Sequence, residues 1–440
     1  MVLLLILLLA GCGGNPGVSR TSPGTTRVLF TASDAAADQV LALEFDVTSL
    51  VLTSNSGATF NVVAPGSSVP IEVAHLSATA QPLAVVDVPQ GTYVSGTITL
   101  ANGELAFVNL TDGSIIEQNF PGPFTISLSF SPNLVVGATP LSVNFDIDMP
   151  QSVTITGTTA TLIPVVLVSS EAIPADPNSQ NVESGKLEDL SGTVTSVGSN
   201  SFGFQVASIA QSLTIFVDNQ TEFEDVAGLS GLTPGMIVEV DAVTQTDGGL
   251  LATKVEAEIE QGVEVEQKAG GFIVGLAANQ ITILVHKAAG AGAPAIGSLL
   301  TVSIDTGTIF AFEDDDVDLS GLPFTPAFDS LADLAIGQEV EVETVTTFAD
   351  PVQVVNLEEE TIGGTATSQV LNQFVLGLDT DSAFRVLSGH SDIDFFVQPG
   401  TELKDISTIA LGSRVRVRGL LFFDAASGRY ELVASRVAGP

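Results

Sequence analysis

The stretch Gly192-Thr193-Val194-Thr195-Ser196-Val197 decides the fold of the C-terminal half of this chain, because two similar stretches follow it. The second reads GFIVGL at residues 271–276, and the third reads GTATSQV at residues 364–370. Each begins with glycine and continues with β-branched residues, which favour strands. The interval of roughly 80 to 90 residues is too long for a solenoid repeat. The three stretches therefore predict a tandem array of small domains.

Each of these units continues with four more short strands, separated by turns. Five short strands are typical of a small closed or partly open barrel, similar to an OB-fold. We expect three such barrels, at residues 187–260, 261–360 and 361–440.

Upstream, residues 27–168 contain seven or eight stretches of alternating apolar and polar residues. Strands at this spacing predict a β-sandwich. The best hairpin signal is Asn102-Gly103, because a type I′ turn needs positive φ at both central residues. A polar, proline-bearing linker at residues 169–186 separates this region from the barrels. The expected fold class is all-β: an N-terminal β-sandwich followed by three tandem small five-stranded, OB-like β-barrels.

The apolar run of residues 2–10 ends in Leu9-Ala10-Gly11-Cys12, which resembles a bacterial lipobox. The resemblance implies that residues 1–11 are a signal peptide and that the Cys12 thiol carries a lipid. The run is far shorter than the ~20 residues that span a bilayer, although a buried strand or an N-terminal membrane anchor is the alternative. Residues 12–26 form a polar tether, and Gly13 in place of Asp favours the outer membrane.

Three short motifs carry a wider resemblance: SDAAAD at residues 33–38, VTSL at 47–50 and PQGTY at 89–93. With the repeats, they are similar to an uncharacterised family of bacterial envelope lipoproteins. In that family a prealbumin-like or carbohydrate-binding-like β-domain precedes tandem OB-like β-repeats. The family often has proline where this chain has Ala36. The resemblance implies a fold and a location, and it implies no chemistry.

The charge balance is strongly acidic, with 51 Asp and Glu against 13 Lys and Arg, a net charge of −38. Such a chain repels nucleic acid and attracts divalent cations or basic partners, although the charge also serves solubility. No Lys or Arg lies between Arg27 and Lys186, so the carboxylates of the sandwich have no cationic partner nearby in the sequence.

Signals of catalysis and of sugar binding are weak. The three histidines, His75, His286 and His390, stand in different segments, and no Gly-x-Ser-x-Gly or HExxH motif is present. The chain has no Trp and two Tyr, which argues against the stacking platforms of sugar sites. We therefore expect no enzymatic activity.

One acidic loop could bind calcium, because it offers hard oxygen ligands at Glu313, Asp314, Asp316 and Asp318. It lacks the spacing of an EF-hand, and a solvated acidic loop is the alternative interpretation. No other cofactor is expected.

The fourth strands of the three units alternate valine with charge, so we expect valines in each core and charges on each outer face. We call these charges the first acidic stripe, the second acidic stripe and the arginine stripe. They comprise, in that order, Glu239 and Asp241; Glu339, Glu341 and Glu343; and Arg414, Arg416 and Arg418. Either the arginine stripe protects an edge strand, or it docks on an acidic stripe of the same chain or of a neighbour.

The sequence as a whole favours a lipid-anchored protein of the cell envelope with a non-enzymatic structural or interaction role. The alternative is a surface lipoprotein that binds a ligand, either a polysaccharide or a divalent cation. The expected partners are the membrane, through the lipid, and other envelope proteins or a second copy of the chain. Nucleic acid is not an expected partner.

Overall fold

The computed structural model describes residues 24–35, 38–64, 66–74, 76, 80–181, 184–206, 212–257, 259–260, 263–312, 317–404, 406–425 and 427–439. Cys12, His75, Glu313, Asp314 and Asp316 lie outside these residues. The protein is all-β and consists of a β-sandwich followed by OB-like barrels, as the sequence predicts. In the described ranges, no helix has the length and apolar character needed to span a membrane.

The sandwich forms from two sheets with one shared core, in which Phe30, Phe45, Phe107 and Phe145 are buried. One sheet has the order β12-β9-β1-β5, with bounds Val166–Ala172, Leu141–Asp148, Thr25–Ala35 and Gln81–Pro89. The other has the order β3-β2-β6-β7, with bounds Thr59–Val63, Val40–Ser54, Gly91–Val108 and Ile115–Phe120. Two further strands join this second sheet: β4 (Val69–Glu72) pairs with β2, and β8 (Phe124–Val136) pairs with β6.

The predicted hairpin at Asn102-Gly103 is wrong, because β6 runs through both residues. The pairing with β2 shifts there, from Ala101 opposite Asp46 to Glu104 opposite Glu44. Asn102 has the positive φ, 50°, that the sequence signal demands. A bulge uses that conformation here, because the long partner strand β2 keeps the two halves of β6 in one sheet.

The three barrels share one strand order: first, second, third, fifth, fourth. In the third barrel the ring β27-β28-β29-β31-β30 is closed, with bounds Glu359–Val370, Gln373–Gly377, Asp392–Lys404, Arg429–Ala438 and Arg414–Asp424. The first barrel has the order β15-β14-β13-β17-β18, with bounds Ser212–Phe216, Ser201–Val206, Lys186–Val197, Ile237–Thr244 and Leu250–Ala257, and β15 also pairs with β18.

The second barrel repeats this order, and in both barrels the third strand is divided: in the first barrel its second part is β16 (Glu222–Glu224), which pairs in parallel with β18. Its sheet reads β23-β22-β21-β25-β26-β24, with bounds Leu299–Ser303, Gln280–Gly290, Gln267–Ala277, Glu339–Thr344, Val354–Leu357 and Ile309–Phe312. The third strand of the unit is thus split into β23 and β24, and β24 pairs in parallel with β26.

The repeated glycine of the three units has a steric cause. A Cβ atom on Gly192 would lie 2.4 Å from the backbone oxygen of Gln205. A Cβ atom on Gly271 would lie 2.0 Å from that of Leu284, and one on Gly364 would lie 2.7 Å from that of Gly377. At the same point in each barrel, the first strand crosses so close to the second that a side chain does not fit.

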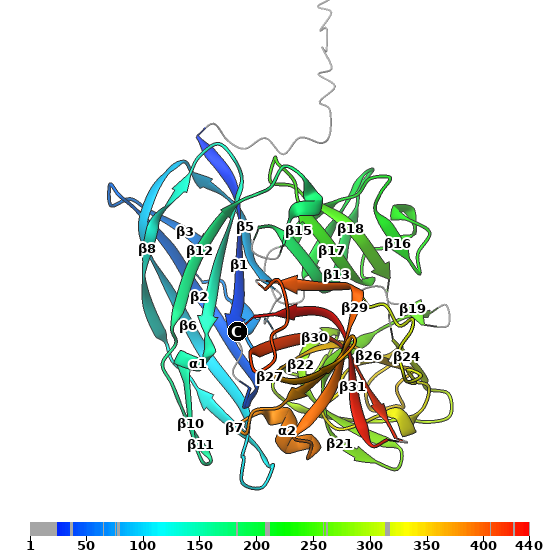
Figure 1. Ribbon diagram of the computed structural model, residues 1–440. Coiled ribbons are helices and arrows are strands. Elements are labelled where there is room, and N and C mark those ends of the chain that lie inside the picture. Colours follow the sequence, from blue (N-terminus) through cyan, green and yellow to red (C-terminus); the bar gives the residue numbers. More distant parts are fainter. Residues whose placement is uncertain are drawn as a thin grey trace, which may run out of the picture.

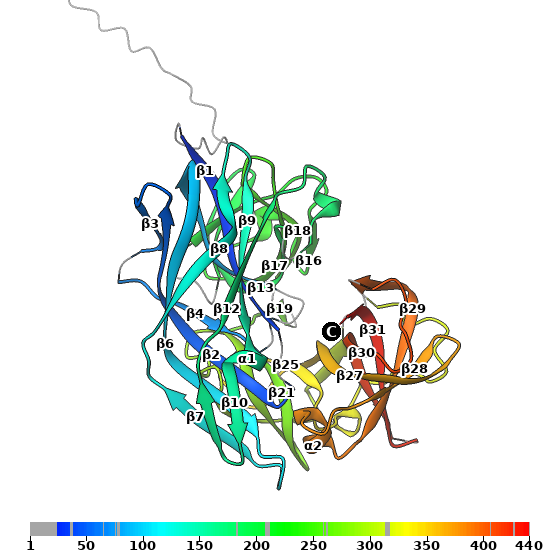
Figure 2. The same ribbon diagram turned by 60° about the vertical axis from the view of Figure 1, so that its left-hand side comes forward.

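The sandwich occupies one side of the molecule and the barrels occupy the other (Figures 1 and 2). A small apolar cluster joins β2 and β6 of the sandwich to β22 of the second barrel and to helix α2 (Ala383–Ser388). Its buried members are Leu41, Ala42, Ala106, Val108, Leu284 and Ala383. The backbone N–H of Ala383 also donates to the carbonyl oxygen of Asp38 at 2.7 Å. Docking of sandwich and barrels therefore buries apolar surface and satisfies a helix N-terminus.

Candidate binding cavity between the sandwich and the barrels

A cavity of about 410 Å³ lies where the sandwich meets the three barrels, and we call it the central cavity. Strand β2 of the sandwich contributes Glu44, and β13 of the first barrel contributes Glu188. The second barrel supplies residues from β21, β22 and β25, and the third barrel supplies residues from β27, β30 and helix α2. This volume lies within the range of small-molecule sites.

Carboxylates outnumber cations in the lining of the central cavity. Among the described residues, nine carboxyl side chains line it, and they are Asp38, Glu44, Glu72, Glu188, Glu339, Glu341, Glu358, Glu359 and Glu360. The permanently cationic side chains in the lining are Lys268, Lys287 and Arg418. Apolar residues complete the wall, including Leu41, Ile71, Phe272 and Phe384.

The sequence predicts that the second acidic stripe lies on an outer, solvent-exposed face. In the structure, the stripe instead points toward the interior of the molecule. Val340 and Val342 enter the core of the second barrel, as expected from the alternation. The side of β25 opposite this core is covered by the neighbouring domains, so Glu339, Glu341 and Glu343 are 7%, 3% and 2% exposed. The three glutamates therefore lie on the outer face of their own barrel, as predicted, but they are buried in the whole protein.

A bulge places two neighbouring residues of β22 on the central cavity. Lys287 pairs with Gly270 and Val285 pairs with Gly271, so His286 is the extra residue. Strict alternation would send His286 and Lys287 to opposite faces, whereas a bulge relaxes that rule. Both residues line the cavity, and His286 Nε2 lies 2.5 Å from Glu339 Oε1.

The Lys287 side chain crosses β21 over Gly270 to reach β25. A Cβ atom on Gly270 would lie 2.6 Å from Lys287 Cε, so the missing side chain makes room for this path. Lys287 Nζ lies 3.1 Å from Glu341 Oε2 and 3.1 Å from Glu358 Oε2. One lysine is therefore shared between two carboxylates.

Lys268 is the most deeply buried cation of the site, at 1% exposure. Its Nζ atom lies 2.9 Å from Glu341 Oε1 and 3.3 Å from Glu239 Oε2, so it also links the second barrel to the first. Burial alone would raise the pKa of Glu341, but Lys268 and Lys287 hold it well below its usual range. Glu341 is the fully compensated carboxylate of the cavity.

Glu44 and Glu360 have no cationic partner among the described residues. Glu44 is flanked in the sheet by Glu72 and Glu104, and burial together with these neighbours raises its pKa to about 7. Glu360 is 2% exposed and accepts one hydrogen bond, from the backbone N–H of Glu339 at 3.3 Å. Burial and the nearby Glu339 carboxylate raise the pKa of Glu360 well above its usual range.

These raised pKa values make the stability of the protein pH-dependent. Because the native state holds protons that the unfolded state releases, the free energy of unfolding should fall as pH rises from about 5 to about 8. We expect a loss of about 1 kcal/mol from Glu44, after allowance for its partial exposure, and a further loss from Glu360 in the same direction. Urea unfolding at several pH values measures it. In a Glu44→Gln/Glu360→Gln variant, the free energy of unfolding should fall less steeply with pH. An unchanged dependence on pH would contradict the raised pKa values of these two carboxyl groups.

The arginine stripe binds acids at the edge of the central cavity. Arg418 Nε lies 2.8 Å from Glu359 Oε2, and Arg414 pairs with both Asp38 and Asp379. Glu359, Asp38 and Asp379 belong to neither acidic stripe. Glu239 of the first acidic stripe instead contacts Lys268, and Asp241 is half-buried on β17. Docking of the arginine stripe onto a second copy stays a prediction.

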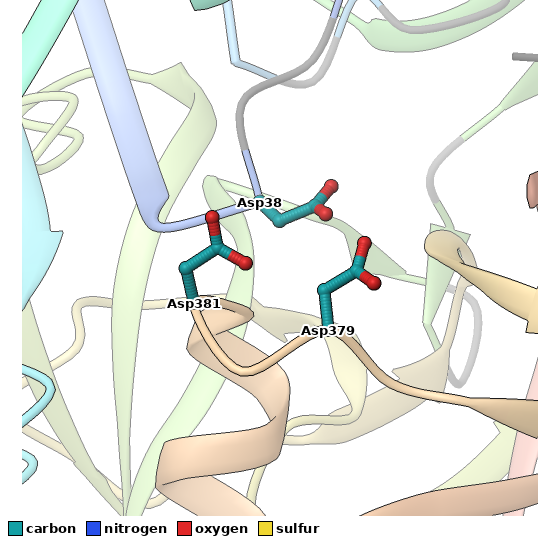
Figure 3. Close-up of side chains that lie close together, drawn as sticks. All are labelled: Asp38, Asp379 and Asp381. Atoms are coloured by element: carbon teal, nitrogen blue, oxygen red, sulfur yellow. The ribbon is translucent and has the colours of Figure 1, made fainter.

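Asp38, Asp379 and Asp381 bring their carboxylate oxygens within 4.8 Å of one another. Figure 3 shows that Asp38 comes from the segment before β2 and that the other two come from the turn before α2. Arg414 already neutralises part of this charge, so the cluster ties the sandwich to the third barrel. Of the predicted calcium ligands, the described Asp318 accepts a hydrogen bond from the Ser320 N–H at 2.9 Å.

Comparisons with known proteins place one segment in a sequence family. Residues 191–256, within the first barrel, match DUF5666, a domain of unknown function. No curated protein matches the chain. Among solved structures, a Drosophila Unr fragment, CSD456, is 14% identical with a TM-score of 0.13, and the match covers 56% of this chain and 94% of the fragment. A multidomain protein with nucleic acid binding domains from Streptococcus pneumoniae TIGR4 is 12% identical with a TM-score of 0.12, covering 56% and 72%.

Proposed function

We propose that this chain is a lipid-anchored protein of the cell envelope that binds a small polar molecule in the central cavity without transforming it. The cavity itself is the observation that supports this function best. It has the volume of a small-molecule site, and its wall combines apolar residues with a few charged groups. Because all three barrels and the sandwich contribute to the wall, a bound ligand would hold the four domains together.

Pairing among the lining residues suits binding better than catalysis. Lys268 and Lys287 are engaged by Glu341, and His286 is engaged by Glu339. Groups held in such pairs are positioned to recognise a ligand and are less available as nucleophile or base. The pairing thereby favours binding over catalysis, and the cavity itself favours the ligand-binding interpretation over a purely structural or interaction role.

Thermal unfolding with small solutes tests this function. Something that binds only the native state raises the unfolding temperature as its concentration rises. We expect one charge class among cationic, neutral and anionic solutes to do so. An Ala293→Trp variant, which fills the cavity from a loop of the second barrel, should abolish the rise. If no class of solute stabilises either the wild type or the variant, the binding function is contradicted and a purely structural role is the remaining interpretation.

The anchor is tested separately. A Cys12→Ser variant should lose its lipid, because no thiol remains to be acylated, and should move from the membrane to the soluble fraction of the envelope. Mass spectrometry of the N-terminal peptide of the wild-type protein should show an acylated Cys12. A variant that stays in the membrane fraction would contradict the lipobox prediction.

A further inference from the structure

Two carboxylates of the central cavity stand on different domains, and both lack a cation among the described residues. Glu44 lies on β2 of the sandwich, and Glu360 lies on β27 of the third barrel. Next to Glu360, Glu359 uses Oε2 for Arg418, while its buried Oε1 has no hydrogen-bond partner. Buried polar atoms are nearly always satisfied, so Glu359 Oε1 calls for a partner that enters the cavity, and Glu44 and Glu360 offer the same partner two further carboxylates.

The partner must be cationic. The three permanent cations of the wall are already engaged by Glu341, Glu358 and Glu359, while Arg414, Lys186 and His286 pair with Asp38, Glu188 and Glu339. Glu44 and Glu360 are the wall acids for which the described residues supply no such partner. An anion would meet these two acids with like charge, whereas a cation stabilises their ionised form as it binds.

The arrangement of the acids favours an organic cation over a metal ion. A calcium or magnesium ion needs several oxygens converging within about 2 to 2.6 Å of one point. Among the described residues, the acids that converge closely enough are Asp38, Asp379 and Asp381, and neither Glu44 nor Glu360 belongs to that group. Apolar side chains such as Leu41, Ile71 and Phe272 share the wall with the unpaired carboxylates. Acids on two different domains that share one wall with apolar residues match a molecule with two charged ends and an apolar middle.

On the basis of the proposed binding function, we propose that the central cavity takes a short aliphatic diamine or a similar organic dication. One ammonium group pairs with Glu44, and the other pairs with Glu360 and the free oxygen of Glu359. The methylene chain lies against the apolar wall, where it loses contact with water. Ammonium groups donate three hydrogen bonds each, which satisfies the carboxylate oxygens that the protein leaves unpaired.

Isothermal titration calorimetry of the full chain near pH 8 tests the proposal with three four-carbon probes: putrescine, butanediol and succinate. Putrescine should bind saturably, whereas the neutral diol and the dianion should not. A Glu44→Gln/Glu360→Gln variant should bind putrescine at least tenfold more weakly, about 1.4 kcal/mol by the tenfold rule. The matched control is Glu117→Gln, which removes an exposed acid of the sandwich, on β7, that lies outside the cavity wall. It should bind as the wild type does.

Each other outcome overturns the inference. Tighter binding of butanediol or succinate than of putrescine would keep the binding function and refute the ligand class. Equal putrescine affinity for the wild type and the double variant would refute the site. Calcium or magnesium binding that the double variant loses would replace the diamine with a metal ion. Absence of binding by any of these probes would refute the diamine, and the broader solute panel would still decide the binding function.

Discussion

Replacing Gly271 by alanine should destabilise the protein by about 3 kcal/mol or more, although it adds a single methyl group. That methyl carbon would lie 2.0 Å from the Leu284 backbone oxygen, a distance that real atoms do not tolerate. Relief requires β21 and β22 to separate, because a backbone oxygen cannot rotate away as a side chain can. Overpacking of this kind disrupts the barrel where its first two strands cross.

Gly275→Ala is the matched control for this prediction, because Gly275 lies four positions later on the same strand. A Cβ atom there would meet Thr282 Cβ at 3.3 Å, which a small shift of the side chain relieves. The unfolded chain becomes less flexible in both variants, which favours the folded state by about 0.4 to 1 kcal/mol. Urea unfolding should therefore separate the two variants widely. Equal stability of the two would contradict the steric origin of the repeated glycine.

Replacing Glu341 by leucine should cost about 3 kcal/mol or more of the free energy of unfolding. Lys268 Nζ would lose its 2.9 Å partner while its side chain stays buried, and its ion pair with Glu239 Oε2 is longer, at 3.3 Å. Lys287 would lose one of the two carboxylates that it bridges and keep Glu358. Removing one member of a buried ion group leaves a charge that water cannot solvate.

A second substitution distinguishes this cause from loss of packing. Adding Lys268→Met to Glu341→Leu removes the buried charge that has lost its shorter ion pair and leaves the Lys287–Glu358 pair intact. The double variant should then be more stable than Glu341→Leu alone, although it carries more changes. Urea unfolding measures both. A double variant that is less stable than the single one would show that shape, and not charge, sets the cost.

The barrels were predictable from the sequence because their signals are local. A glycine at the start of each unit and the alternation of valine with charge in each fourth strand are both visible in the residues alone. The structure adds the reason for the glycine, which is the approach of a neighbouring backbone. It also shows that Asn102 takes the conformation expected of a turn, in a bulge created by pairing with β2.

The central cavity was not predictable in this way, because it depends on how four domains pack. Alternation assigns Glu341 to the outer face of its barrel, and only the neighbouring domains make that face interior. The bulge at His286 and the gap over Gly270 bring Lys287 to the site, and neither follows from strand periodicity. One feature of the sequence could have pointed to the central cavity. The acidic run Glu358-Glu359-Glu360 stands at the junction of two predicted barrels.

The number of protons released when putrescine binds shows directly whether Glu44 and Glu360 receive the ligand. Titrations near neutral pH in buffers of different ionisation enthalpy give that number for the wild type and for Glu44→Gln/Glu360→Gln. Because burial and neighbouring acids raise the pKa of Glu44 to about 7 and that of Glu360 well above its usual range, we expect net proton release when putrescine binds to the wild type. We expect little release from any residual binding to the double variant. Saturable binding without proton release, or with proton uptake, would contradict the claim that these carboxylates receive the ligand.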